Sequence, residues 1–274
     1  MKVWFITGAS RGFGALITEK VLAQGDAVIA TSRSIKAITD RFGSPKNLLA
    51  LPLDVTREDQ AIAAAKTAFE HFGKIDILLN NAGFGLLGAV EEATTAEVES
   101  LYKTNVFGML NVTRAVLPYM RKAGSGRILN ISSIGGYRGA AGFGVYSSTK
   151  FAVEGLSEAL HAELMPLNIY VTVVEPGYFR TDFLDVTSLS TSPVQISDYD
   201  ATVGKVRRAA LELNHSQPGD PSKLASVLVS FVDAPNPPVR LPLGSDTVAA
   251  IEKKHIEDAE IIAKWREISI STDF

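Results

Sequence analysis

Residues 3–14 have the sequence VWFITGASRGFG, a short apolar run followed by three closely spaced glycines. Val3–Ile6 predicts a β-strand, and Phe13–Ala23 predicts a helix that ends before Gly25. A tight strand-to-helix turn whose backbone approaches a ligand favours glycine. The amides of such a turn and the helix N-terminus suit a pyrophosphate. The GxxxGxG spacing differs from the common GxGxxG dinucleotide fingerprint, and an ordinary tight turn is the alternative.

Beyond this turn, strand-like runs alternate with helical stretches. Further strands are predicted at Ala27–Ala30, Leu48–Leu51, Ile75–Leu79, Arg127–Ile131, Ile169–Val174 and Val239–Leu241. Helices are predicted at about Arg57–Phe72, Ala96–Met120, Tyr146–Leu164 and Pro221–Val232. The continuous apolar run at Ile75–Leu79 is typical of a strand buried on both faces. The alternation predicts an α/β fold, in which a doubly wound parallel sheet (Rossmann) lies between two layers of helices.

The chain has 274 residues and a formal charge of −3, and 46% of its residues are hydrophobic. These values are typical of a single globular domain, expected here over residues 1–274. Within it, about 180–215 is expected to form a mobile substrate-binding loop with short helices. Residues from about 246 to 267 are expected to form an amphipathic helix that packs on protein, because its polar face mixes both charge signs.

Composition excludes several classes of function. With no cysteine in the chain, disulfides, thiolate zinc sites and cysteine nucleophiles are ruled out. The four histidines lack metal-ligand spacing, so no metal is expected. A mildly negative charge argues against a nucleic-acid binder. No apolar run approaches the ~20 residues of a membrane span, and the N-terminal run is too brief for a signal peptide. We therefore expect no membrane partner and a cytoplasmic location.

The motif TGASRGFG resembles TGxxxGxG of the short-chain dehydrogenase/reductase family, in its single-domain branch. The resemblance continues in the family's order through Asn80-Asn81-Ala82-Gly83, Asn105, Ser133, Tyr146-x-x-x-Lys150 and Pro176-Gly177-x-x-x-Thr181. Together, in this order and spacing, the motifs are specific. The tail, with Leu241-Pro242-Leu243-Gly244, is more weakly similar to retinol and hydroxysteroid dehydrogenases. The resemblance implies hydride transfer between a nicotinamide dinucleotide and a carbonyl or alcohol.

The dinucleotide site is expected to hold NADP(H). An acidic residue at the end of the second strand would bind the ribose hydroxyl of NAD, but this chain has Ser32 there, followed by Arg33. A guanidinium suits phosphate, and Arg11 is expected to converge on the same group; solvated surface arginines are the alternative. The resemblance places Asp54 on the adenine, while a capping role is the alternative. The expected cofactor-binding residues are Gly8, Ser10, Arg11, Gly12, Phe13, Gly14, Ser32, Arg33, Asp54, Val55, Asn81, Ala82, Gly83, Tyr146, Lys150, Pro176, Gly177 and Thr181.

Tyr146 and Lys150 are four residues apart on a predicted helix and therefore share one face. A cation ~4 Å from a phenol lowers its pKa by roughly three units at an effective dielectric near 20. The resemblance implies that Tyr146 is the proton donor in reduction and the base in oxidation, with Lys150 on the nicotinamide ribose. It further implies that Ser133 binds the substrate carbonyl and that Asn105 supports a relay to Lys150. An ordinary aromatic–lysine pair is the alternative.

The sequence thus predicts an NADPH-dependent carbonyl reductase, reversible as a secondary alcohol dehydrogenase. Candidate pocket residues suggest a mainly apolar substrate, although each could equally be core: Phe84, Tyr137, Phe143, Val145, Tyr178, Phe183 and Leu184. The alternatives are a catalytically silent dinucleotide-sensing or scaffold protein, and a sugar-nucleotide epimerase or dehydratase. The glycine spacing and the lack of a large C-terminal substrate domain disfavour the epimerase. The family resemblance implies a homodimer or homotetramer.

Overall fold

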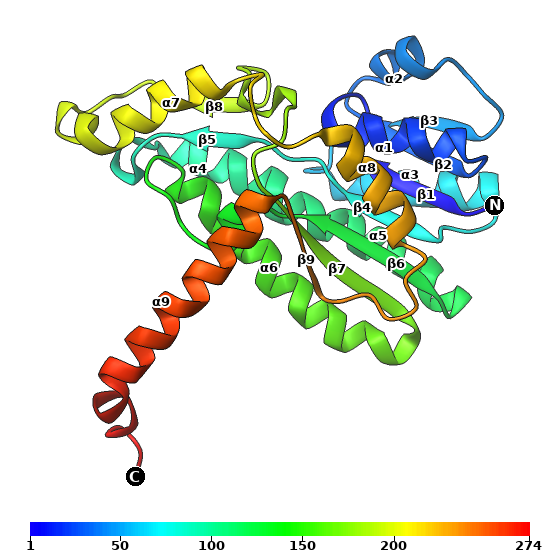
Figure 1. Ribbon diagram of the computed structural model, residues 1–274. Coiled ribbons are helices and arrows are strands. Elements are labelled where there is room, and N and C mark those ends of the chain that lie inside the picture. The colour runs from blue at the N-terminus through cyan, green and yellow to red at the C-terminus, as the bar shows by residue number, and fades with distance from the viewer.

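A computed structural model describes residues 1–274, with a seven-stranded parallel sheet at its centre (Figure 1). Its strands, in the order β3-β2-β1-β4-β6-β7-β9, are β3 (Leu48–Pro52), β2 (Ala27–Ser32), β1 (Val3–Thr7), β4 (Ile77–Asn80), β6 (Gly126–Ile131), β7 (Ile169–Pro176) and β9 (Arg240–Leu243). β1 pairs with β2 from Val3–Ala27 to Thr7–Thr31, and with β4 on its other side. The predicted doubly wound parallel sheet is confirmed.

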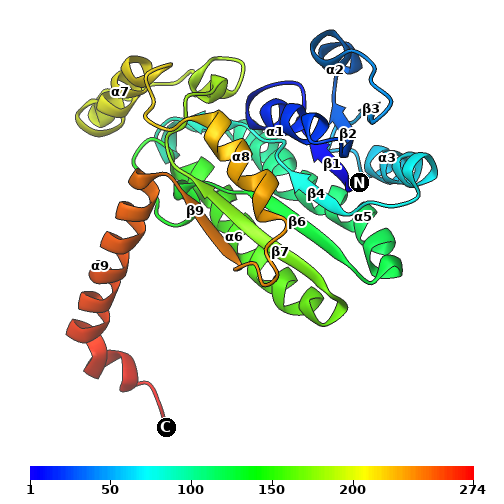
Figure 2. The same cartoon turned by 45° about the vertical axis from the view of Figure 1, so that its right-hand side comes forward.

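Helices cover both faces of this sheet (Figures 1 and 2). The chain has nine α-helices in all: α1 (Gly12–Ala23), α2 (Ile35–Phe42), α3 (Glu58–Phe72), α4 (Thr95–Tyr102), α5 (Met109–Ala123), α6 (Gly144–Leu164), α7 (Lys205–Leu213), α8 (Pro221–Phe231) and α9 (Ser245–Ile270). Side chains alternate between the faces along each strand. Trp4 and Ile6 of β1 belong to the core under α1 and α8, while Val3 and Phe5 belong to the core under α3 and α5. The three predicted layers are therefore present.

The order of the strands places a binding crevice at one edge of the sheet. From β1 the chain winds outward to β2 and β3, and then crosses back to β4 on the other side of β1. Ligands of such sheets bind where this reversal occurs, outside the carboxyl ends of the strands. The glycine turn follows β1 at this edge, and Asn81 follows β4.

The helix predicted over 96–120 is not uniform. α4 and α5 are joined without a break by a π-helical segment, Lys103–Gly108, which contains Asn105. An inserted π-turn widens the helix by one residue and is common at functional sites. The insertion turns the buried Asn105 side chain toward the loop after β4, where its amide hydrogen-bonds the backbone of Phe84.

The segment predicted as a mobile loop, about 180–215, contains more regular structure than expected. β8 (Leu189–Thr191) pairs in parallel with β5 (Gly85–Leu87), a short strand that follows the Asn81-Ala82-Gly83 turn. Short helical turns at Asp182–Leu184, Ser197–Tyr199 and Asp200–Gly204 lead into α7. The buried Glu92 carboxylate accepts from the backbone N–H of Ile196 and pairs with Arg207, so it fixes this segment to the body.

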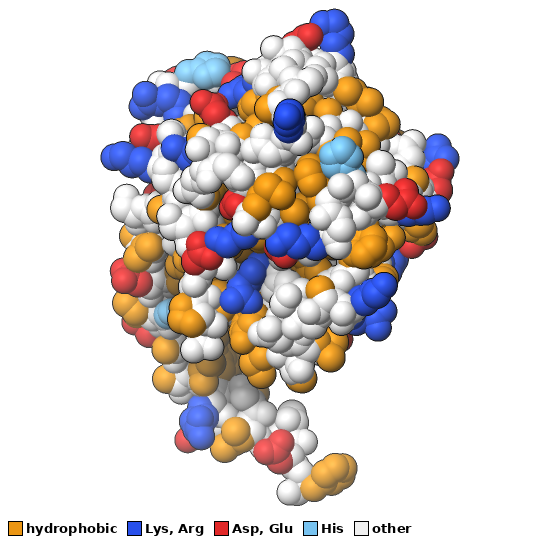
Figure 3. All heavy atoms as spheres, turned by 90° about the vertical axis from the view of Figure 1, so that its right-hand side faces the viewer, with side chains coloured by type: hydrophobic (Ala, Val, Ile, Leu, Met, Phe, Trp, Pro, Cys, Tyr) orange, Lys and Arg blue, Asp and Glu red, His pale blue; other side chains and the backbone are white.

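α9, at the place of the helix expected over about 246–267, projects from the body of this chain (Figures 1 and 2). Its first half is anchored, by the buried Thr247 and by a contact between His255 and Tyr137. Farther along, Ile256 and Ile262 are each 62% exposed and Trp265 is 50% exposed. Figure 3 shows the end of the chain standing clear of the body with apolar side chains on its surface. No helix in the structure combines the length and apolar character that crossing a bilayer requires.

Candidate active site

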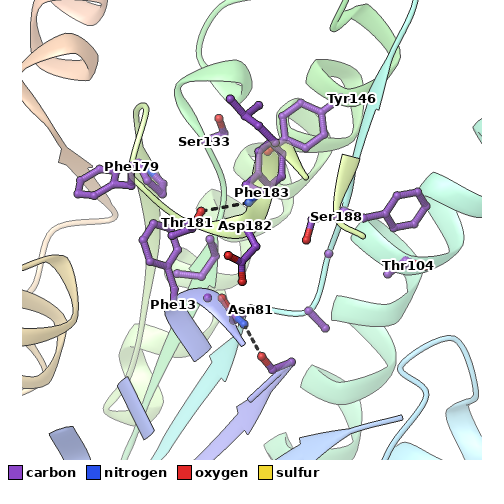
Figure 4. Close-up of a pocket in the computed structure, with 18 of the residues that line it drawn as sticks. Phe13, Asn81, Thr104, Ser133, Tyr146, Phe179, Thr181, Asp182, Phe183 and Ser188 are labelled. Carbon is purple, nitrogen blue, oxygen red and sulfur yellow. Dashed lines mark hydrogen bonds between the residues drawn. The ribbon is translucent and has the colours of Figure 1, made fainter. Parts of the chain in front are cut away.

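A cavity with a volume of about 950 Å³ opens at the carboxyl ends of β1, β4, β6 and β7. It runs from the glycine turn and the end of β2 to Tyr146 and Lys150 of α6. In Figure 4, Tyr146 and Ser133 lie toward one end, with Phe13 and Asn81 away from them. All the predicted cofactor and catalytic residues line this cavity except Gly14 and Asn105, which lie just behind its wall.

The glycine turn forms a cradle for an anion. Gly8 and Gly12 adopt positive φ angles of 66° and 52°, which glycine tolerates best. Gly14 is required by packing, since a Cβ there would lie 2.3 Å from the carbonyl oxygen of Gly8 and 2.6 Å from Nδ2 of Asn81. No side chain caps the N-terminus of α1, so its first N–H groups remain available to a ligand in the cavity. A free helix N-terminus beside open space fits a pyrophosphate.

Asn81 holds this turn against the neighbouring strand. Its Nδ2 donates to the carbonyl oxygens of Thr7 at 2.9 Å and Gly8 at 3.2 Å. The hydroxyl of Thr7 in return accepts from the backbone N–H groups of Asn81 and Ala82. These contacts tie β1 to β4 at the floor of the cavity.

At the outer end of the cavity, basic groups replace the acid that would favour NAD. Ser32 donates to the carbonyl oxygen of Ser34 at 2.6 Å, and Arg33 is exposed at the mouth. Arg11 spans the mouth and donates to the carbonyl oxygen of Thr187 at 2.6 Å. Asp54 Oδ1 accepts from both the N–H and the hydroxyl of Thr56, which is the capping alternative. A dinucleotide, with phosphate near two arginines, fits this donor set.

Tyr146 and Lys150 converge at the inner end, one turn apart on α6, and each is only 7% exposed. Nζ of Lys150 donates to the carbonyl oxygen of Ile131 at 2.8 Å and lies 5.7 Å from the centre of the Tyr146 ring. Ser133 follows β6, and its Oγ accepts from the N–H of Gly135 at 3.1 Å. A Cβ on Gly135 would lie 3.5 Å from both Ser133 Oγ and a Tyr146 ring carbon, so the phenol and the serine share one corner.

Burial dominates the protonation of this pair. It raises the pKa of the Tyr146 phenol, against the opposing effect of a hydrogen bond with Ser133. The sequence predicted a lowered pKa, which is wrong for this structure because Lys150 is hydrogen-bonded to Ile131 and the phenol is desolvated. Burial lowers the pKa of Lys150 to about 8, while the charge of Glu154 acts to raise it. At neutral pH the site therefore holds a neutral phenol and a charged ammonium.

Asn105 is a supporting residue behind the wall. Its Nδ2 donates to Phe84 O at 2.9 Å and to Thr149 Oγ1 at 3.2 Å, and its Oδ1 accepts from Phe84 N at 3.1 Å. These partners occupy the side chain, so it makes no direct bond to Lys150. Gly83 lies next to both side chains, since a Cβ there would lie 3.1 Å from Asn105 Oδ1 and 3.9 Å from Lys150 Nζ.

Aromatic side chains enclose the phenol. The ring centres of Phe143 and Phe183 lie 6.2 Å and 5.6 Å from that of Tyr146. Of the seven predicted pocket residues, Phe84, Phe143, Tyr178, Phe183 and Leu184 line the cavity. Tyr137 and Val145 do not: Tyr137 turns outward to His255 of α9, and Val145 packs beside the cavity. This apolar corner can exclude water from a reacting carbonyl.

The segment 182–190 brings polar residues to the cavity that the sequence did not predict. They are Asp182, Thr187, Ser188 and Ser190, and Figure 4 shows the carboxylate of Asp182 pointing away from Phe183. Their position depends on the pairing of β8 with β5, for which no local pattern gives a signal. No group of three or more histidine, aspartate or glutamate side chains is placed to hold a metal ion.

The parallel sheet and the uncapped α1 are typical of a dinucleotide-binding fold, and Ser133, Tyr146 and Lys150 converge at one end of its cavity. A profile described as short chain dehydrogenase matches residues 2–190. This chain belongs to the short-chain dehydrogenase family, whose members are oxidoreductases.

Among relatives, a 3-ketodihydrosphingosine reductase from Bacteroides thetaiotaomicron is 40% identical over 89% of this chain and 88% of its own length. A solved short-chain dehydrogenase from Streptomyces avermitilis is 40% identical, with a TM-score of 0.91 over 100% of this chain and 99% of that one. More distant solved structures hold dinucleotides. A serine dehydrogenase with NADP+ is 28% identical (TM-score 0.74, covering 88% and 94% of the two chains). A 3-ketoacyl-(acyl-carrier-protein) reductase from Brucella melitensis with NADH is 27% identical (TM-score 0.74, 88% and 96%).

Proposed function

We propose that this protein is an NADPH-dependent carbonyl reductase that also works in reverse as a secondary alcohol dehydrogenase. One observation carries the proposal: a single cavity joins an uncapped helix N-terminus with two arginines to a buried phenol and an ammonium one helical turn apart. The first end suits a phosphorylated dinucleotide. The second suits proton transfer to a carbonyl oxygen.

In carbonyl reduction, each residue of the site would have a separate role. When bound, the dinucleotide supplies the hydride, which adds to the carbonyl carbon. Ser133 Oγ and the Tyr146 hydroxyl donate hydrogen bonds to the carbonyl oxygen, and Tyr146 gives it a proton as negative charge develops there. The raised pKa of Tyr146 keeps that proton in place at neutral pH. The Lys150 ammonium binds ribose hydroxyls and stabilises the phenolate left behind.

The cofactor-binding roles proposed for Gly8, Ser10, Gly12, Phe13 and the other predicted residues rest on their position around the cavity. Pro176, Gly177 and Thr181 would hold the nicotinamide carboxamide, and Asp54 with Val55 the adenine. Gly14 and Asn105 would act from behind the wall, by shaping the turn and by fixing the loop at Phe84.

The proposed substrate is a mainly apolar ketone, because Phe84, Phe143, Phe183 and Leu184 surround the phenol. The relative named as a 3-ketodihydrosphingosine reductase supports a long-chain ketone in this class. The segment at about 180–215 would cover the bound substrate. Consumption of NADPH with a panel of aryl, alkyl and long-chain ketones tests the proposal. Dinucleotide binding without turnover of any ketone would favour the silent sensor instead.

Replacing Arg33 with alanine is expected to raise the KM for NADPH about 10- to 100-fold, because a charge-assisted bond to the 2′-phosphate contributes about 1.5–3 kcal/mol. The KM for NADH should stay unchanged, since that cofactor lacks the phosphate. Steady-state kinetics with both cofactors measures the effect. Arg41→Ala, an arginine of α2 outside the cavity, serves as the control. Equal changes for both cofactors would contradict an NADP preference set by Arg33.

We further propose that the protein is a homodimer or homotetramer. The exposed apolar side chains of α9, including Ile256, Ile262 and Trp265, support association, because a single chain leaves them in water. Light scattering on the purified protein is expected to give two or four times the mass of one chain. The mass of a single chain at micromolar concentration would refute this. A cytoplasmic location stays a prediction of the sequence.

A further inference from the structure

Behind Lys150, three carboxylates surround one arginine. Nη1 of Arg240, on β9, lies 2.5 Å from Glu154 Oε2 and 2.8 Å from Glu175 Oε1, and Nη2 lies 2.9 Å from Glu158 Oε1. The side chains of Glu154 and Glu175 are only 4% and 1% exposed, whereas that of Glu158 is 52% exposed. This cluster lies outside the cavity and has no part in the reaction described above.

The inner pair of carboxylates has fewer partners than two charges require. Glu154 Oε1 and Glu175 Oε2 are both buried without a hydrogen-bond partner, as is the hydroxyl of Ser132 beside them. Two carboxylates that share a single guanidinium nitrogen in a buried site are stabilised when they hold one proton between them. Burial raises the pKa of Glu154 to about 7, and Glu175 adds to this, while Ser132 and Arg240 act in the opposite direction.

Glu154 links this cluster to the catalytic lysine. It follows Lys150 by one turn of α6, so the two side chains share one face of the helix. Its charge acts to raise the pKa of Lys150 against the effect of burial.

Charged and polar groups from several elements surround Glu154. Glu158 lies one turn farther along α6, Glu175 comes from β7 and Arg240 from β9. The turn at Ile134–Gly136 brings only Gly136, where a Cβ would lie 2.9 Å from Glu154 Oε1. Next to it, the Tyr137 ring lies 5.3 Å from the Arg240 guanidinium, and the Tyr137 hydroxyl is bonded to His255 of α9.

We propose that Glu154 is a positioning residue for the reaction: it shares a proton with Glu175, and its charge keeps Lys150 an ammonium and so sets the pH range of alcohol oxidation. The inference rests on the proposed role of Tyr146 and Lys150. Without the charge of Glu154, the pKa of Lys150 falls. A neutral lysine no longer stabilises the phenolate, so the pKa of Tyr146 rises, and the base needed for oxidation forms only at higher pH.

The test is a pair of substitutions with opposite expected signs. Glu154→Gln keeps the shape of the side chain and removes its charge. For oxidation of a secondary alcohol with NADP+, kcat/KM rises with pH, and in this variant the rising limb should lie about one pH unit higher. Glu175→Gln leaves Glu154 with Arg240 and no competing acid. Glu154 is then more fully charged, and the rising limb should lie at lower pH than in the wild type. Damage to the fold alone would not shift the two variants in opposite directions.

Glu158→Gln is the matched control, because Glu158 is on the same helix and binds the same arginine, but is 52% exposed and lies one turn farther from Lys150. It should leave the limb unmoved. Unshifted limbs in both Glu154→Gln and Glu175→Gln, or the same shift in all three variants, would overturn the inference while leaving the proposed function intact.

A second measurement does not depend on turnover. The pKa of Lys150 can be followed by NMR in protein labelled with ¹³C at lysine Cε, with the resonance assigned through Lys150→Arg. It should fall in Glu154→Gln and rise in Glu175→Gln. An unchanged Lys150 pKa in both variants refutes the electrostatic link. A shifted Lys150 pKa in a protein that turns over no ketone or alcohol would instead refute the proposed function and keep the link.

Discussion

Substituting Tyr146 with phenylalanine should lower kcat for ketone reduction by about 10²- to 10⁴-fold, the usual contribution of a positioned proton donor. The phenol is enclosed by Phe143 and Phe183 and shares a corner with Ser133. Phenylalanine fills the same space. The packing around α6 and the affinity for the dinucleotide should therefore stay close to those of the wild type.

Stopped-flow measurement of NADPH absorbance gives kcat, and calorimetric titration gives the Kd for NADP+. Tyr102→Phe is the control, because the Tyr102 hydroxyl donates to Ser148 outside the cavity and has no role in the proposed reaction. That variant should keep wild-type turnover. If Tyr146→Phe reduces ketones at the wild-type rate, Tyr146 is not the proton donor. If it loses NADP+ binding as well, its role is structural.

Gly14→Ala should abolish measurable binding of the dinucleotide and destabilise the protein. The added methyl group would lie 2.3 Å from the carbonyl oxygen of Gly8, a backbone atom that cannot move without changing the whole turn. Overpacking of this kind typically costs about 1–3 kcal/mol. Relief of the clash would displace the start of α1 from the turn and spoil the anion cradle. The expected result is a lower Tm together with no detectable heat of NADP+ binding.

Gly139→Ala provides the comparison, since Gly139 is exposed and a Cβ there would meet nothing within 4 Å. It should keep both the Tm and the Kd of the wild type. Wild-type affinity in Gly14→Ala, with or without a lowered Tm, would contradict binding of the dinucleotide at the glycine turn.

The sheet could be predicted from the sequence because its signals are local. Each central strand is a compact apolar run, and the glycine turn after Val3–Ile6 marks the first crossover. The helix α2 was not predicted, although the sequence carries a signal for it: the hydroxyl of Ser34 accepts from the N–H of Ala37 and caps the helix. The residues around the cavity were found for the same reason, since most of them follow directly on the carboxyl ends of predicted strands.

What could not be predicted depends on contacts between residues far apart in the chain. Glu154 and Arg240 are 86 positions apart, so the carboxylate cluster behind Lys150 has no local signature. The same holds for β8, which pairs with β5 across about a hundred residues. The direction of the Tyr146 pKa was predicted wrongly, because burial, and not the spacing to Lys150, decides it. The π-turn at Asn105 likewise could not be predicted, because the periodicity of the apolar residues does not reveal it.

The most direct test of the account is a crystal structure of the protein with NADP+ and a slowly reacting secondary alcohol. We expect the pyrophosphate at the N-terminus of α1, the 2′-phosphate near Arg11 and Arg33, and the alcohol oxygen within hydrogen-bond distance of the hydroxyls of Tyr146 and Ser133. A dinucleotide bound elsewhere would contradict the account. So would a nicotinamide ring kept from Tyr146 by the side chain of Phe183, with the phenol turned away from the alcohol.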